Sequence, residues 1–346
     1  MTESSRPAGP SPAVPTALLD DALLGRIRTR AAGHDAANTF PFDDIAELAE
    51  AGYLRALVPV QFGGLGLTLP QLAAEQARLA AHAPATALAV NMHLVWTGVA
   101  KAMHDRGDTA LDFVLTEAAQ GAVFGFGVSE PGNDLVLFGS STTAVPQHGG
   151  GYSFTGTKVF TSLSPVWTQL GTMGLDSTDP DRPLIVWAFL DRSDPGITRA
   201  DDWDTLGMRA SQSQTTVLAG ALAPADRVVR MLQPGPVSDP LIFGIFATFE
   251  ILLSSVYTGL AQRALELGSR PRSDAGRPRT TAARWRRTRT SAAGSPRRRC
   301  CWMRSGRRST PSPTTWTPSP TTARSGSPGW PVSSTAAWRA PNRSST

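Results

Sequence analysis

Apolar residues recur at helical spacing from residue 17 to about residue 120. Residues 43–52 begin with two acids and end at a glycine, which is typical of a short helix. Residues 70–83 carry apolar side chains along one face, and residues 85–103 are long and almost wholly apolar. The pattern predicts an N-terminal α-helical domain over residues 17–121.

The pattern changes near Gly121, where Val or Phe begins to alternate with Gly. Short β-rich runs follow, separated by glycine- and proline-containing turns, at residues 142–145, 152–154, 184–190 and 215–219. We expect a central antiparallel, barrel-like β-domain over residues 122–234. A helical pattern then returns, and residues 235–268 are predicted to be the first helix of a C-terminal α domain. The predicted fold class is therefore α+β.

Residues 269–346 differ sharply in composition from everything before them. They contain no Leu, Ile, Phe or Tyr, and they hold 17 arginines against one acid, Asp274. Such a segment cannot bury enough apolar surface to offset its ordering entropy, so we expect a disordered tail. Residues 1–16 are rich in Pro and Ser and are also expected to be disordered. They contain no apolar secretory signal, which favours a cytoplasmic protein.

The tail has a second interpretation, a reading-frame error. Trp302 and Met303 have unique codons, and both codons for cysteine begin with TG. Moving the frame back by one base across residues 300–303 gives Leu-Leu-Asp, which is ordinary helix sequence. This interpretation is favoured, and it predicts that a further helical segment is missing from the chain as written.

Charge and hydropathy restrict the kinds of binding partner that we expect. Residues 1–268 carry 16 basic and 27 acidic side chains, so this part gives no reason to expect binding to nucleic acid or to an anionic membrane. A non-enzyme alternative rests on the arginine-rich tail alone, as a nucleic-acid-binding or scaffold protein. Residues 241–260 have the length of a membrane span but contain Glu250, which favours a buried bundle helix.

Three clusters carry candidate chemistry, at strand ends or in the bend after them. They are residues 126–134, residues 156–162 and residues 202–209. The chain has no phosphate loop, no dinucleotide fingerprint and no metal-spaced Cys and His set. Both cysteines lie in the tail and all five histidines lie before residue 150, so thiol and histidine-triad chemistry have little support.

The α–β–α order and these clusters together resemble the acyl-CoA dehydrogenase family over residues 17–268. Residues 40–42, 51–54 and 58–66, together with His93, add to the resemblance. It implies an FAD-dependent desaturation of an acyl-CoA or acyl-carrier thioester, with an electron-transfer flavoprotein as the acceptor. It also implies a homo-oligomer built through the C-terminal helices. A chain without those helices would lack that surface and part of the FAD site, and would be inactive.

The resemblance assigns the flavin site residue by residue. Phe126 and Val128 would contribute backbone contacts and Ser129 its hydroxyl, because a flavin ring needs polar partners at its edge. Phe160 would pack beside the isoalloxazine, and the Ser162 hydroxyl would reach the ring nitrogen that accepts hydride. The alternatives are purely structural. Ser129 would be a local cap, and the strand would have Phe160 in the core and Ser162 exposed.

Substrate contacts are less well matched. Asn133 and Asp134 follow the Pro-Gly turn directly, whereas the family has two more residues there, so their contact with the acyl-CoA arm departs from the family pattern. Arg209 matches a family bend, and pairing with Asp202 or Asp204 explains it equally well. We do not count it as catalytic.

Dehydrogenation also needs a carboxylate that removes the α-proton of the thioester. Glu250 is the candidate, as a lone acid in an apolar helix. It stands one residue after the family position, which falls on Phe249, and one residue is about 100° of helix rotation. A salt-bridge role is the alternative. Within enzymes, the rival function is a flavin-dependent monooxygenase on the same fold, which the shortened turn favours.

Overall fold

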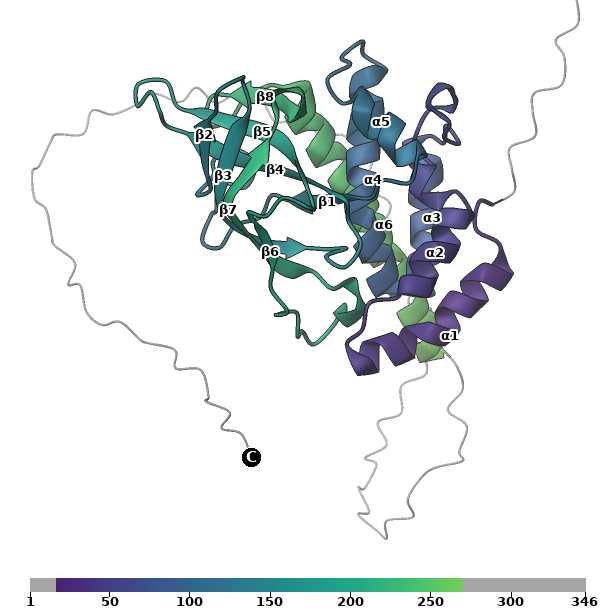
Figure 1. The fold of residues 1–346 in the computed structure, drawn as a ribbon. Helices are drawn as coiled ribbons and strands as arrows, with labels where there is room; N and C mark the ends of the chain where they lie inside the picture. The colour runs from purple at the N-terminus through teal and green to yellow at the C-terminus, as the bar shows by residue number, and fades with distance from the viewer. Residues whose placement is uncertain (1–16, 270–346) are drawn as a thin grey trace, which may run out of the picture. The chain divides into compact units, whose positions relative to one another are not determined.

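The computed structural model describes residues 17–269 (Figure 1). The helices before the sheet are α1 (Asp21–Ala37), α2 (Phe42–Glu50), α3 (Leu69–Ala80), α4 (Pro84–His104) and α5 (Asp112–Ala119). Short 3₁₀ turns lie at Tyr53–Arg55, Val60–Phe62, Arg209–Ser211 and Ala225–Arg227. The predicted disorder of residues 1–16 and of the tail lies outside the described residues, apart from Ser269, which ends a helix.

The predicted N-terminal helices are confirmed as α2, α3 and α4. α3 begins with a capping box, in which Thr68 and Gln71 satisfy each other's backbone donors. α4 is buried along almost its whole length, which accounts for its nearly continuous apolar sequence. It is therefore the central helix, against which β1 and the helices α2, α3, α5 and α6 pack.

The strands form one mixed sheet in the order β6-β7-β3-β2-β4-β5-β8, with β1 paired to β4. Their bounds are β1 (Phe124–Gly127), β2 (Thr143–Pro146), β3 (Tyr152–Thr161), β4 (Gln169–Asp176), β5 (Leu184–Asp191), β6 (Ile197–Arg199), β7 (Gln214–Ala223) and β8 (Val228–Leu232). Most strand pairs are antiparallel, as predicted. The sheet is nevertheless mixed, because β1 and β2 both run parallel to β4.

Helices and sheet meet where α4 crosses β1 and β4. The Trp96 indole nitrogen donates to the Gly125 carbonyl at 2.9 Å, and the ring packs against Phe126 and Phe189. A Cβ at Gly171 would lie 2.3 Å from the Trp96 ring, so only glycine allows this approach. The junction is therefore a close-packed core of large aromatic side chains.

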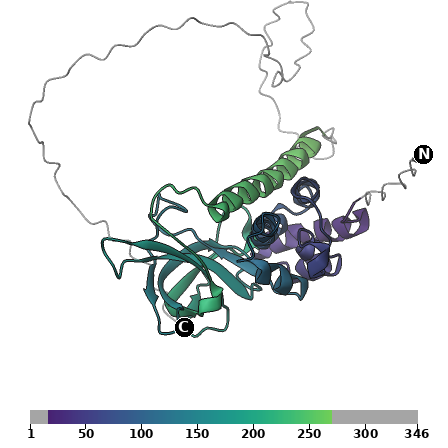
Figure 2. The same ribbon diagram turned by 90° about the horizontal axis from the view of Figure 1, so that it is seen from above.

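The last described element is α6 (Pro240–Ser269), which packs along α3 and α4 (Figures 1 and 2). A Cβ at Gly259 would lie 2.1 Å from the Ala77 carbonyl oxygen, which shows how closely α6 approaches α3. α6 is long and apolar enough to cross a membrane by length and composition, and 44% of its most apolar window is buried against the protein. Phe243, Tyr257 and Leu265 are among its exposed apolar residues.

Candidate functional site

A cavity of about 460 Å³ lies between the sheet, α4 and α6. Six of the eight residues that the sequence assigned to a site line it: Phe126, Val128, Ser129, Phe160, Ser162 and Glu250. The other lining residues are Leu88, Met92, Val136, Leu137, Trp203, Ser213, Ile245, Phe246, Phe249, Leu253 and Tyr257. Segments far apart in sequence thus converge on one space, lined mainly by apolar and aromatic side chains.

The first cluster follows β1 into the cavity wall. The Phe126 ring stacks on Phe249 of α6, with ring centroids 5.8 Å apart. Ser129 is exposed, and its carbonyl accepts a hydrogen bond from the Val159 backbone N–H at 2.9 Å. That bond ties the first cluster to β3, which carries most of the second cluster.

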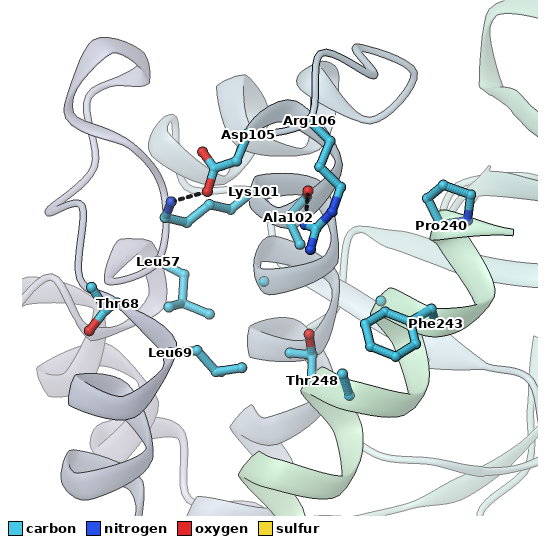
Figure 3. Close-up of a pocket in the computed structure, with 13 residues that line it drawn as sticks. Leu57, Thr68, Leu69, Lys101, Ala102, Asp105, Arg106, Pro240, Phe243 and Thr248 are labelled. Atoms are coloured by element: carbon cyan, nitrogen blue, oxygen red, sulfur yellow. Dashed lines mark hydrogen bonds and ion pairs between the residues drawn. The ribbon is translucent and has the colours of Figure 1, made fainter.

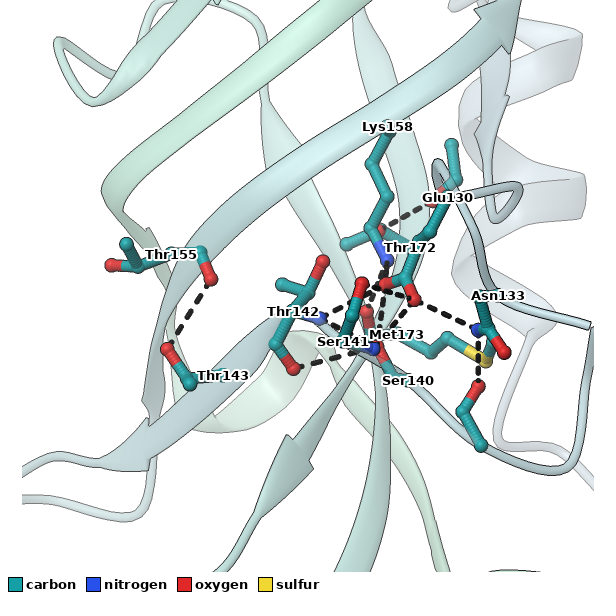
Figure 4. A network of polar contacts seen from close by, with 12 residues as sticks. Glu130, Asn133, Ser140, Ser141, Thr142, Thr143, Thr155, Lys158, Thr172 and Met173 are labelled. Carbon is teal, nitrogen blue, oxygen red and sulfur yellow. Dashed lines mark hydrogen bonds and ion pairs between the residues drawn. The ribbon is translucent and has the colours of Figure 1, made fainter. Parts of the chain in front are cut away.

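Glu130, next to Ser129, turns away from solvent into a saturated polar network (Figure 4). Its carboxylate accepts six hydrogen bonds, from Lys158, Asn133, Ser140, Thr142 and both the backbone and the hydroxyl of Ser141. The Lys158 ammonium also donates to the Met173 carbonyl at 2.7 Å. The network fixes the turn after β1 to the middle of β3.

Burial and pairing compete in setting the charges of this network. Burial alone would raise the pKa of Glu130, but Lys158 and the surrounding donors hold that pKa well below its usual range. Burial lowers the pKa of Lys158 to about 8, although Glu130 opposes the shift. Glu130 is therefore ionised and Lys158 protonated at pH 7.

The second cluster ends β3 with an unusual backbone. Phe160 has φ 58°, in the left-handed region that a phenylalanine rarely adopts, and 63% of it is exposed. Its ring meets Trp203 edge-on at 6.3 Å. Ser162 is buried, and its hydroxyl lies 2.7 Å from the Ser213 hydroxyl. The alternative with Phe160 in the core and Ser162 exposed is therefore the reverse of what the structure shows.

Arg209 in the third cluster holds the bend. Its guanidinium pairs with Asp204 at 2.7 Å and donates to the Thr205 and Asp35 carbonyls. Asp202 instead accepts a hydrogen bond from the Thr215 backbone N–H. The structural explanation of Arg209 thus agrees with its contacts, and Trp203 is the residue of this cluster that reaches the cavity.

The two predicted substrate residues lie outside the cavity lining. The Asn133 amide donates to Glu130 and to the Gly139 carbonyl, and Asp134 is exposed. Glu250 and its neighbour Phe249 both line the cavity, so the one-residue offset keeps a carboxylate there. Glu250 is exposed, and within residues 17–269 its side chain takes part in no hydrogen bond or ion pair. All three roles stay predictions.

Sequence reasoning missed one polar residue of the lining, Ser213. Its partner Ser162 is 51 residues away in sequence, and no spacing rule connects them. A second cavity, of about 370 Å³, lies between α3, α4 and α6 (Figure 3). It is lined by Leu57, Leu69 and Phe243 among others and has a Lys101–Asp105 pair at its rim, but it contains no predicted site residue.

The cavity fits the ring system of a flavin. Phe126, Phe160 and Trp203 offer flat apolar surfaces, and the hydroxyls of Ser129, Ser162 and Ser213 offer polar partners for the ring edge. No lysine, arginine or histidine lines this cavity, so a flavin phosphate would find its cationic partners elsewhere. Within the described residues, no group of three His, Cys, Asp or Glu side chains could hold a metal ion.

Comparison with known proteins places this geometry in a family. Residues 20–108 match the family model "Acyl-CoA dehydrogenase, N-terminal domain". The chain is 30% identical over 262 residues to L-evernosamine nitrososynthase from Micromonospora sp., covering 71% of this chain and 58% of that protein. It is 27% identical to putative acyl-CoA dehydrogenase YdbM from Bacillus subtilis, covering 70% of this chain and 62% of YdbM.

A dibenzothiophene monooxygenase from Rhodococcus erythropolis is 26% identical, with 75% of this chain and 63% of that protein covered. Among solved structures, KijD3 in complex with FMN and a dTDP-linked amino sugar superposes with a TM-score of 0.64 at 30% identity, covering 73% of this chain and 63% of KijD3. The chain spans less than two thirds of the length of each of these relatives. Residues 17–269 therefore have the fold of the acyl-CoA dehydrogenase superfamily.

Proposed function

We propose that this chain is the flavin-binding part of a flavin-dependent monooxygenase. The composition of the cavity carries the proposal, because it is lined by apolar and aromatic side chains, three serines and one carboxylate. Such a space suits a flavin ring beside a compact apolar substrate. The relatives named as a nitrososynthase and as a dibenzothiophene monooxygenase support oxygenation over desaturation.

The turn after β1 argues against a thioester substrate. The family turn that contacts the acyl-CoA arm is shortened here, and Asn133 is already bound to Glu130 and Gly139. Asp134 is not among the residues that line the cavity. The residues expected to hold the long CoA arm are therefore committed to the protein itself or lie outside the cavity.

A bound flavin supplies the electrons and the oxygen activation that monooxygenation needs. The residues of this chain would provide the surroundings. Phe160 and Trp203 would cover the ring and exclude water, and the serine hydroxyls would hold its polar edge. Glu250 would accept a hydrogen bond or a proton from an N–H or O–H group of the substrate. We propose FMN as the flavin, because the bound KijD3 structure contains FMN.

The second candidate function is acyl-CoA dehydrogenation with FAD. Glu250 favours it, because a carboxylate in the cavity is what α-proton removal requires. The match to YdbM also favours it. The two functions imply different partners: a reductase that supplies reduced flavin for the monooxygenase, and an electron-transfer flavoprotein for the dehydrogenase. A homo-oligomer is expected for either.

One pair of assays separates the two functions. The purified chain is loaded with FMN or FAD, and the bound flavin is identified after release. With chemically reduced flavin and O2, we expect a small thioether or amine to gain one oxygen atom while the other leaves as water. The oxygenated product is measured above the background oxidation of free reduced flavin, with no requirement for a thioester. Bleaching of bound oxidised FAD by short- and long-chain acyl-CoA without oxygen would instead establish the dehydrogenase. A chain that retains neither flavin would refute both functions.

A further inference from the structure

Three serine hydroxyls form a chain that begins in the core and ends at the cavity. The Ser211 hydroxyl lies 2.7 Å from that of Ser213, which lies 2.7 Å from that of Ser162. Ser162 and Ser213 line the cavity, whereas Ser211 does not and has no exposed surface. Within residues 17–269 these hydroxyls have no other side-chain or carbonyl partner. The chain joins the end of β3 to the start of β7.

The number of hydroxyl hydrogens determines what the three serines can donate to a ligand. Three hydroxyls carry three hydrogens, and their two mutual hydrogen bonds use two of them. The third hydrogen is left either on Ser211, where burial leaves it without an acceptor, or on Ser162 or Ser213, where it can point into the cavity. A buried donor without a partner carries its full desolvation penalty. The remaining hydrogen therefore belongs to one of the two cavity serines.

We propose that Ser213 is a second ligand-binding hydroxyl, interchangeable with Ser162 as the one O–H donor that these three buried serines present to the cavity. The inference rests on the proposed flavin site and goes beyond it, because it names a residue and a polarity. In the resting arrangement Ser211 donates to Ser213. Either Ser213 donates to Ser162, which then donates to the ligand, or Ser162 donates to Ser213, which then donates to the ligand. In both arrangements the three serines present one donor at this point of the cavity, so they select a ligand that offers an acceptor atom there.

The same count of hydrogens predicts which serine-to-alanine variants still donate a hydrogen bond to the ligand. Ser162→Ala leaves two hydrogens and one mutual bond, so one hydrogen remains for the ligand from Ser213. Ser213→Ala leaves the hydrogen of Ser162 for the ligand. Ser211→Ala leaves the pair Ser162 and Ser213, again with one hydrogen free. Only Ser162→Ala combined with Ser213→Ala removes every donor that the three buried serines present to the cavity, and it leaves the Ser129 hydroxyl in place.

The test is the dissociation constant of oxidised FMN, measured by fluorescence titration of the full chain. Each single variant is expected to bind FMN within about threefold of the wild type, and the double variant about tenfold or more weakly. Ser164→Ala is the matched control, because Ser164 is equally buried nearby and donates to the Thr161 carbonyl, away from the ligand. It should leave the dissociation constant unchanged. Thermal unfolding of each variant shows that binding is compared between folded proteins.

Two results would overturn the inference. If Ser162→Ala alone weakens FMN binding as much as the double variant does, Ser213 is no donor to the ligand, and the proposed flavin site still stands. If the two single losses simply multiply to give the double loss, the hydroxyls act independently and the shared donor is wrong. A wild-type chain that binds neither FMN nor FAD refutes the proposed function together with this inference.

Discussion

The Glu130 network and the serine chain lie close together in the sequence but differ in charge and in hydrogen bonding. Glu130 is charged, accepts six hydrogen bonds and has no lone pair left to offer. The serine chain is neutral and keeps one hydrogen without a partner inside the protein. Ser162 stands four positions after Lys158, just beyond the end of β3. The closed network stabilises the scaffold, and the open one is available to a ligand.

Breaking the closed network should have the largest effect on stability. Lys158→Met removes the ammonium but leaves the Glu130 carboxylate buried, so we expect the free energy of unfolding to fall by about 3 kcal/mol or more. Urea unfolding monitored by circular dichroism measures it. Ser162→Ala is the comparison from the open network and should lower the free energy of unfolding by about 1 kcal/mol. Equal losses in the two variants would refute the contrast.

A third buried polar group, His93, adds a pH dependence of stability between about pH 4 and pH 6.5. Its Nε2–H donates to the Leu54 carbonyl, and its Nδ1 accepts from the Phe124 backbone N–H. Burial lowers the pKa of His93 to about 4, although the Leu54 carbonyl opposes the shift. The histidine is therefore neutral where it joins α4 to β1.

Because the folded protein resists protonation at His93, its stabilising contribution is complete above the unfolded pKa of about 6.5 and is lost as the pH falls toward 4. The loss at this site amounts to roughly 3 kcal/mol. Chemical denaturation at a series of pH values between 7 and 4 measures it. His93→Gln should be less stable at pH 7 and show a shallower fall. An unchanged slope in the variant would assign the pH dependence to other groups.

Substitutions of Phe160, beside the serine chain, should affect stability and ligand binding differently. Its left-handed backbone conformation suits glycine better than any residue with a Cβ. We expect Phe160→Gly to be more stable than Phe160→Ala by about 1 kcal/mol, because alanine keeps the backbone strain. Both variants lose the ring and should bind FMN more weakly. The free energies of unfolding of the two variants give the difference, and a more stable alanine variant would contradict it.

The ion pair between Asp204 and Arg209 should have the smallest effect on stability. Asp204 is 82% exposed, so Asp204→Ala should lower the free energy of unfolding by less than about 0.5 kcal/mol. Arg209→Ala should cost more, because its guanidinium also holds two backbone carbonyls. Thermal denaturation of both variants tests the order. A larger loss in the Asp204 variant would show that the ion pair itself holds the bend.

Local patterns predicted much of this fold, because helices and half-buried strands have their own periods. α2, α3, α4 and β5 all lie close to where the apolar pattern placed them. β4 was missed, since its glycines at 171 and 174 interrupt the alternation that marks a strand. Its parallel pairing with β1 and β2 was missed for another reason: strand direction is set by long connections, which leave no local signal.

For the candidate site, too, local sequence patterns predicted some residues and not others. Six of the eight residues assigned from sequence line one cavity, because each belongs to a short motif at the end of a strand or on one helix. Asn133 and Asp134 do not, since the shortened turn binds Asn133 into the Glu130 network. Ser213 could not be found from the sequence, because only the folded sheet brings β7 beside Ser162.

The position of α6 at the end of the described chain has a consequence during synthesis. The sheet and α4 leave the ribosome before the residues of α6 that close the cavity, including Phe246, Phe249 and Tyr257. Until α6 docks, Phe126 lacks the ring that stacks on it, and the flat apolar face of the site is open to the solvent. We expect a flavin present at that stage to cover this face, so that a larger flavin supply during expression increases the yield of folded chain.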